Sequence, residues 1–219
     1  MNTKVNTQIR DININNILRN TYQLLSATLL FSGLMAYFAM SLNLPNFGFL
    51  ITLGGYFGLL YLTNKLKNSS YGILAVFALT GFMGLTLGPI IGTYTTTFSN
   101  GSELIAMAMT GTGLIFLSLS FYAVTSGKDF SFLSGFLTAG IIVAFLAGIA
   151  AYFFAIPALS LTVSVIFILL MSGLILFETS NIIHGGETNY IMATVTLFIS
   201  IYNLFLSLLQ LLGVFSGED

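Results

Sequence analysis

Charged side chains are scarce in this chain. Only 6% of its 219 residues are Asp, Glu, Lys or Arg, while 56% are hydrophobic. A soluble domain carries about 25% charged residues, so this chain could not cover its own surface with solvated groups. The apolar runs are long and continuous rather than alternating at every second residue, which favours helices over a β-barrel. The sequence therefore predicts an all-α polytopic membrane protein, surrounded by membrane lipid.

Several kinds of chemistry are excluded by residues that the chain lacks. It has no cysteine and a single histidine, His184, so neither a disulfide framework nor a thiolate is available. His184 and Glu187, in the sequence HGGE, offer one imidazole and one carboxylate, whereas zinc sites use three or four protein ligands. The sequence has no HExxH motif, phosphate loop or dinucleotide fingerprint. We expect no metal, no cofactor, no nucleic-acid partner and no enzymatic activity.

Seven apolar runs, close to the span of about 20 residues that a membrane helix needs, are separated by short polar loops. They cover residues 20–42, 47–63, 71–94, 103–125, 132–154, 159–183 and 190–214. The loops are too short to form a second domain. We expect a flexible cytosolic tail at 1–19, a single seven-helix bundle at 20–214 and a short external tail at 215–219.

The basic residues predict the orientation of this bundle. Counting loops alternately from a cytosolic N-terminus places every lysine and arginine on the cytosolic side, and the C-terminus outside. The opposite side receives only Glu103, Glu218 and Asp219 among charged residues. This distribution follows the positive-inside rule. The basic residues concerned are Lys4, Arg10, Arg19, Lys65, Lys67 and Lys128.

Small residues recur at four-residue spacing in two of the runs. One series is Gly84 and Gly88, and the other is Gly140, Ala144 and Gly148. In lipid, such positions let helix backbones approach closely. We expect both series to pack within one bundle rather than to form a dimerisation face.

Glu178 is the one carboxylate inside an otherwise uncharged hydrophobic segment. A charge at the centre of a membrane helix costs about 2.5–3.5 kcal/mol on insertion scales, so such residues are rare and commonly functional. Asn181 follows one turn later on the same face. In the last run, polar residues spaced by 3, 4 and 3 form one stripe. The stripe consists of Ser200, Asn203, Ser207 and Gln210.

Two interpretations of Glu178 stay open. Burial favours the protonated acid, whereas a positive charge from Lys65 or Lys67 would favour the carboxylate, and in either state Glu178 is a plausible proton or cation site. In the structural alternative, a neutral glutamic acid hydrogen-bonds two helices together. Beyond this segment, Gly185 and Gly186 suit a turn with positive φ, and Thr188 or Asn189 suits the cap of the last helix.

Four segments resemble the bacterial YccA branch of the Bax inhibitor-one (TMBIM) family, and the similarity extends from residue 19 to residue 214. They are RNTYQLLSATLLFSGLMA (19–36), GFMGLTLGPII (81–91), GKDFSFL (127–133) and ILFETSNIIHGGETNYI (175–191). The resemblance implies seven helices with a cytosolic N-terminus in the bacterial inner membrane.

One activity that the resemblance implies is a pH-sensitive calcium leak. In such family members, two buried aspartates on the sixth and seventh helices share protons and gate the pore. Glu178 matches the first of these positions and Ser200 the second, with Asn203 and Asn181 lining the seam. Because serine is not an acid, a divalent cation would meet one negative charge instead of two, so the calcium mechanism carries over poorly.

The other implied activity concerns FtsH, the membrane-anchored ATP-dependent protease. The YccA branch is described as a substrate and inhibitor of this protease, and the flexible N-terminal tail is the part that the protease grips. In this sequence the tail contains Arg10 and Arg19. We therefore expect an integral membrane modulator of FtsH, with a pH-sensitive cation leak channel as the alternative.

Overall fold

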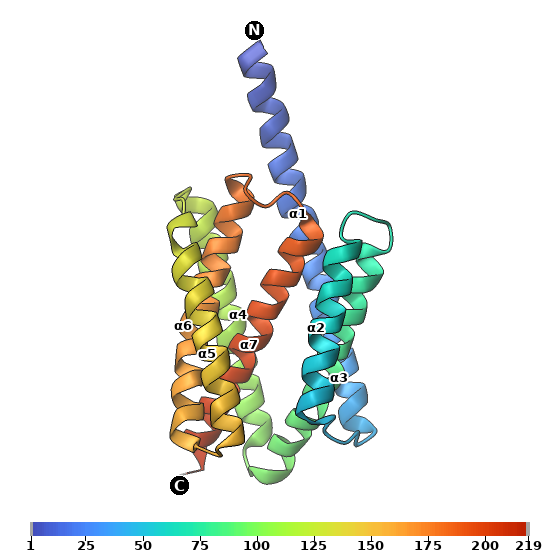
Figure 1. Cartoon of the computed structure of the whole chain (residues 1–219), viewed down its shortest axis with the longest axis vertical. Helices are drawn as coiled ribbons and strands as arrows, with labels where there is room; N and C mark the ends of the chain where they lie inside the picture. The colour runs from blue at the N-terminus through green and yellow to red at the C-terminus, as the bar shows by residue number, and fades with distance from the viewer. Residues whose placement is uncertain (1, 218–219) are drawn as a thin grey trace. The chain divides into compact units, whose positions relative to one another are not determined.

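The computed structural model describes the backbone of residues 2–217 and the side chains of residues 13–217. Within that range the chain forms seven α-helices, one short 3-10 turn and no β-strand (Figure 1). The elements are α1 (Asn2–Ser41), α2 (Gly48–Leu66), α3 (Gly72–Thr97), α4 (Gly101–Ser126), η1 (Ser131–Leu133), α5 (Ser134–Phe153), α6 (Pro157–Ile183) and α7 (Tyr190–Ser216).

The predicted all-α membrane fold is confirmed, and each apolar run corresponds to one helix. Among the residues that the structure describes, six helices are long and apolar enough to cross a membrane. The exception is α2, which has 19 residues and carries Asn64 and Lys65 near its end. These two polar residues lower its mean hydropathy, because a helix of this length has no further apolar turns to offset them.

The two ends of the bundle differ from the predicted boundaries. α1 begins at Asn2, so residues 13–19, predicted as part of the tail, are helical and continue into the first apolar run. Arg19 is exposed on this helix, whereas the side chain of Arg10 lies outside the described residues. At the other end, Phe215 and Ser216 belong to α7 rather than to a tail.

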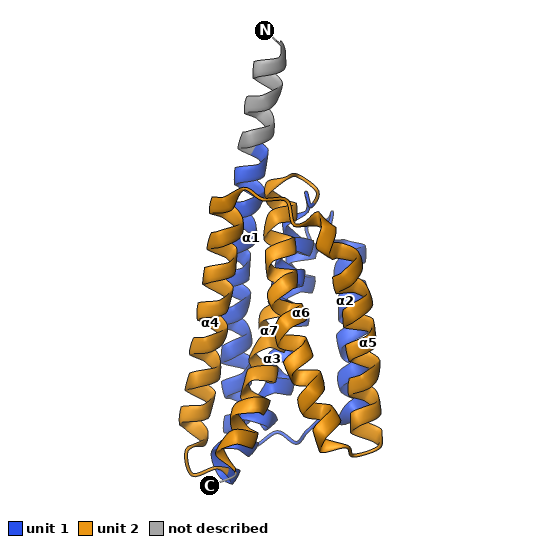
Figure 2. Cartoon of the chain, turned by 90° about the vertical axis from the view of Figure 1, so that its left-hand side faces the viewer, with its two compact units in different colours: residues 1–97, 187–198 blue, residues 98–186, 199–219 orange. Residues whose placement is uncertain are grey.

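The chain forms two compact units (Figure 2), and the single seven-helix bundle at 20–214 stays a prediction. The first contains residues 1–97 and 187–198, and the second contains residues 98–186 and 199–219. α7 therefore contributes its beginning to the first unit and its remainder to the second.

In the first unit, α1 packs along α3 at a distance that only glycine permits. A Cβ atom on Gly84 would collide with the carbonyl oxygen of Ser32, and one on Gly88 would lie 2.6 Å from the carbonyl oxygen of Ala36. The expectation that this pair packs within the chain is confirmed.

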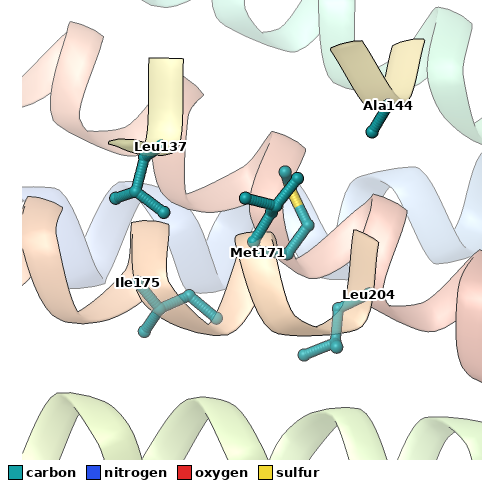
Figure 3. Packing of buried hydrophobic residues seen from close by; sticks show 6 residues of the cluster. Leu137, Ala144, Met171, Ile175 and Leu204 are labelled. Atoms are coloured by element: carbon teal, nitrogen blue, oxygen red, sulfur yellow. The ribbon is translucent and has the colours of Figure 1, made fainter. Parts of the chain in front are cut away.

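The second unit surrounds a hydrophobic cluster drawn from α5, α6 and α7 (Figure 3). A Cβ atom on Gly140 would lie 2.7 Å from Leu170 Cδ2, and Gly148 faces Val163. The second series of small residues thus also packs within the chain. The buried members of the cluster are Leu137, Ala144, Leu170, Met171, Ile175 and Leu204.

Local residues explain where α6 and α7 begin and end. Pro157 occupies the start of α6, where its missing N–H is no loss. The loop after α6 contains Gly185 at φ +78°, as predicted. Asn189, one of the two predicted caps, starts α7 because its Oδ1 accepts hydrogen bonds from the backbone N–H groups of Ile191 and Met192 at 3.0 and 3.1 Å.

The close packing of α1 on α3 predicts the cost of a single added methyl group. Gly84→Ala and Gly88→Ala should each lower the free energy of unfolding by about 1–3 kcal/mol, the usual cost of overpacking, because the neighbouring atoms include α1 backbone that cannot rotate away. Thermal unfolding in detergent measures this. Gly33→Ala is the matched control, since no atom lies within 4 Å of its Cβ position. Equal melting temperatures for all three variants would contradict the packing.

Candidate functional site

Glu178 is buried near the end of α6, with only 5% of its surface exposed. The fully buried side chains of Ile175 and Ile182 share its helix face one turn before and one turn after it. Thr179 and Ser180 follow it directly and are also buried. The carboxyl group is therefore held among apolar side chains, with polar groups gathered at the same end of the helix.

Ser200 lies in the same layer as Glu178, because α6 and α7 run antiparallel in the second unit. Leu204 shares the hydrophobic cluster with Met171 and Ile175. Glu178 follows Ile175 by one turn, and Ser200 precedes Leu204 by one turn. Both residues therefore lie one turn beyond the same end of the cluster along the helix axes. Ser200 is fully buried.

The two predicted asparagines make local contacts. Asn203 Nδ2 donates a hydrogen bond of 2.9 Å to the carbonyl oxygen of Ile199 on its own helix. Asn181 lies at the end of α6, where its carbonyl oxygen accepts a hydrogen bond of 2.8 Å from Gly186 N. Its Oδ1 occupies the position that a side chain on Gly186 would need. Asn181 thus shapes the turn after α6.

The predicted charge partners Lys65 and Lys67 belong to the first unit, at the end of α2. Lys65 is exposed and Lys67 is half-buried. The carbonyl oxygen of Lys67 accepts a hydrogen bond of 3.1 Å from Asn189 Nδ2, which fixes the loop after α2 to the residue that caps α7. A role for either lysine as a charge partner of Glu178 stays a prediction.

Gln210, at the far end of the predicted polar stripe, has partners that sequence reasoning missed. Ser164 Oγ donates a hydrogen bond of 2.7 Å to Gln210 Oε1, and Gln210 Nε2 donates one of 2.6 Å to Ser160 Oγ. A half-buried amide inside a membrane helix needs such partners because hydrocarbon supplies none. The four-residue spacing of the two serines, on one face of α6, was the available signal.

A second polar contact ties the end of α7 to the start of α4. Asn100 Nδ2 donates a hydrogen bond of 2.7 Å to Ser216 Oγ, and Ser216 Oγ lies 3.1 Å from Asn100 Oδ1. Within the first unit, Thr194 Oγ1 donates to the carbonyl oxygens of Tyr190 at 2.7 Å and Thr21 at 3.3 Å. Each part of α7 is thus fixed in its own unit by hydrogen bonds.

The arrangement limits what the site can do chemically. No group of three or more His, Cys, Asp or Glu side chains that could hold a metal ion occurs among the residues that the structure describes. One carboxyl group with a serine in its layer can take up and release a proton or form a hydrogen bond. It supplies fewer oxygen ligands than calcium prefers.

Comparison with known proteins gives consistent matches over almost the whole chain. The model of a family described as inhibitor of apoptosis-promoting Bax1 matches residues 14–217. A protein named modulator of FtsH protease YccA, from Escherichia coli K12, is 52% identical over 93% of this chain and 91% of its own length. An uncharacterized protein of Pseudomonas aeruginosa is 51% identical over 94% of this chain and 92% of its own. An uncharacterized membrane protein of Vibrio cholerae is 40% identical over 100% of this chain and 98% of its own.

The contacts of Gln210 predict a difference between two amides of one polar stripe. Gln210→Ala should lower the free energy of unfolding by about 1–2 kcal/mol, because it removes two hydrogen bonds between helices. Asn203→Ala removes only a bond within its own helix and should cost less. Thermal unfolding of both variants in the same detergent compares them. A larger loss for Asn203→Ala would show that the bonds between α6 and α7 do not stabilise the fold.

Proposed function

The chain belongs to the family described as inhibitors of apoptosis-promoting Bax1, and we propose that it is an integral membrane modulator of the protease FtsH. It is a multi-pass protein of the bacterial inner membrane. The observation that carries the proposal is the 52% identity to the E. coli protein that is named a modulator of this protease. The identity extends over 93% of the chain, so it includes the membrane helices as well as the loops between them.

The proposal includes seven membrane crossings with the N-terminus in the cytosol. α2, with 19 residues, is about 28 Å long at a rise of 1.5 Å per residue. That length is close to the hydrocarbon thickness of about 30 Å, and Lys65 at its end can extend its ammonium group to the headgroups. Seven crossings put the basic residues on the cytosolic side, as the positive-inside rule requires.

The tail is the proposed point of contact with the protease. Thr21 and Leu25 are buried, whereas no side chain of residues 13–19 is fully buried. A partner that held this end of α1 would not have to pull a fully buried side chain of residues 13–19 out of the fold. Residues 1–19 are therefore the proposed engaged segment.

A second function is supported by the burial of Glu178 in one layer with Ser200. It is a proton-sensitive cation leak pathway with Glu178 at its gate, in which Asn203 and Asn181 lie along the seam. With a single carboxylate, protons or monovalent cations fit this pathway better than calcium. A purely structural Glu178 is the remaining alternative, in which Glu178→Gln would lower the melting temperature in detergent.

Removal of the tail tests the protease function. Full-length chain in liposomes with FtsH and ATP should be degraded, because the start of α1 extends beyond the buried residues Thr21 and Leu25 and gives the protease a segment to grip. A chain without residues 2–12 should resist degradation, since the segment that is left begins close to the packed part of α1. A chain whose residues 2–12 are replaced by glycine and serine keeps the length of the tail and changes its sequence. Its degradation shows which of the two the protease requires. Equal degradation of full-length and shortened chains would contradict the proposed contact.

Cation flux into liposomes tests the leak function. The flux through the wild-type chain should change with pH over the range from about 5 to 8. Glu178→Gln should lose this pH dependence. Ser200→Ala should shift the pH at which the flux changes. Thr112→Ala is the matched control for Ser200→Ala, because this buried hydroxyl lies outside the proposed pathway and donates to a carbonyl oxygen of its own helix. If every variant stays folded and none conducts above empty liposomes, the leak function does not apply to this chain.

A further inference from the structure

In the first unit, the loop between α2 and α3 is fixed to the start of α7 (Figure 1). Asn189 Nδ2 donates hydrogen bonds to the carbonyl oxygen of Lys67 at 3.1 Å and to Asn68 Oδ1 at 2.9 Å. A Cβ atom on Gly72 would lie 2.6 Å from Ile191 Cδ1, so the start of α3 also packs closely against α7. The loop therefore holds a fixed position at this end of the unit.

Helix α1 reaches the same end of the first unit. Thr194, one turn into α7, donates a hydrogen bond of 3.3 Å through Oγ1 to the carbonyl oxygen of Thr21. Arg19 precedes Thr21 by two residues on α1 and is exposed. At a rise of 1.5 Å per residue, it lies about 3 Å along the helix axis from this contact. Arg19 is therefore at the end of the unit that also holds the loop between α2 and α3.

All charged residues of the first unit whose side chains the structure describes lie at this end, and most are cations. Arg19 and Lys65 are exposed, and Lys67 is half-buried. The carboxylate among them is Glu187, whose Oε1 already accepts a hydrogen bond of 2.6 Å from Asn189 N. Three positive charges and one negative charge leave a formal net charge of +2. The described residues at the other end of the unit, where α2 begins and α3 ends, carry no charge.

Exposed apolar side chains lie directly beside these cations. On α2, Tyr61 is exposed and precedes Lys65 by four residues, so both lie on one face of the helix. Tyr71, at the start of α3, and Leu74, one turn later, are also exposed, and tyrosine is typical of the membrane–water interface. A surface that is cationic at its end and apolar just inside matches a ligand with an anionic headgroup and acyl chains. A free phosphate ion would use only the cationic part.

We propose that this end of the first unit binds anionic phospholipid, with Arg19, Lys65 and Lys67 attracting the headgroup and the exposed apolar side chains beside them contacting the acyl chains. Each lysine or arginine near a membrane surface raises the affinity for anionic lipid by about fivefold. Because hydrogen bonds to α7 already hold the loop in place, little ordering of the backbone opposes binding. Bound lipid would hold the start of α1, the proposed point of contact with the protease, at a fixed depth in the membrane.

Fluorescence quenching tests this lipid site, because the chain contains no tryptophan and Tyr71→Trp gives it a single fluorophore at the proposed site. The full chain is placed in bilayers of phosphatidylglycerol and phosphatidylcholine at one fixed composition, and either lipid carries brominated acyl chains, which quench the fluorophore on contact. Quenching should be stronger when phosphatidylglycerol is brominated. Lys65→Gln in this background should reduce the preference by up to about fivefold, and Lys65→Arg should retain it. Added sodium chloride should weaken the preference by screening.

Phe132→Trp in the second unit is the matched control. Phe132 is exposed, and it follows a loop in which the charge of Lys128 is matched by that of Asp129. Lys128 Nζ also donates a hydrogen bond of 3.1 Å to Tyr122 Oη. The two brominated lipids should therefore quench this fluorophore about equally.

Several outcomes would overturn the lipid site. One is equal quenching of the Tyr71→Trp chain by both lipids, and another is the same preference in the Phe132→Trp chain. A third is a preference that Arg19→Gln, Lys65→Gln and Lys67→Gln all leave unchanged. Inorganic phosphate should weaken the preference no more than sodium chloride at equal ionic strength, and stronger competition would identify a site for free phosphate instead. Neither FtsH nor cation flux enters this experiment, so its result is independent of both proposed functions.

Discussion

A hydrogen-bonding group without a partner is costly in hydrocarbon, and this constraint governs where most of the buried polar side chains among the described residues lie. An unpaired polar group in the bilayer costs several kcal/mol. In a chain with only 6% charged residues, most of the surface faces lipid, so few polar groups can take water as their partner. Buried hydroxyls such as Thr63 and Thr112 accordingly donate to carbonyl oxygens of their own helices. Two buried hydroxyls, Thr21 Oγ1 and Ser120 Oγ, have no hydrogen-bond partner. Where polar groups reach another element instead, they join helices to one another.

α7 shows this constraint most clearly. In the first unit it is fixed by Asn189 and Thr194, and in the second by Gln210 and Ser216. Apolar contacts set the register between these ends, because Leu204 packs with residues of α6. The layer that holds Glu178 and Ser200 follows from that register. The candidate site thus depends on apolar contacts and hydrogen bonds made at other levels of the same helices.

The sequence predicted what depends on periodicity and composition, and it missed what depends on contacts between distant residues. The turns between the helices, the close packing at Gly84 and Gly88, and Asn189 as one of two candidate caps were predicted correctly, since each reflects local spacing or backbone chemistry. The partners of Gln210 were missed because Ser160 and Ser164 look like ordinary serines of an apolar helix. The contact of Ser180 with the 127–130 loop was missed because it joins residues about fifty positions apart. The helical state of residues 13–19 was missed because polar, asparagine-rich sequence does not reveal that a helix continues through it.

The central claim is that this chain restrains FtsH, and the most direct measurement is the rate at which FtsH degrades a second membrane substrate. Purified FtsH, ATP and that substrate are placed in liposomes with increasing amounts of the full chain. The account predicts that the rate falls as the chain is added, and that it recovers when the added chain lacks its tail. A rate that stays constant at every amount of the folded chain would contradict the account.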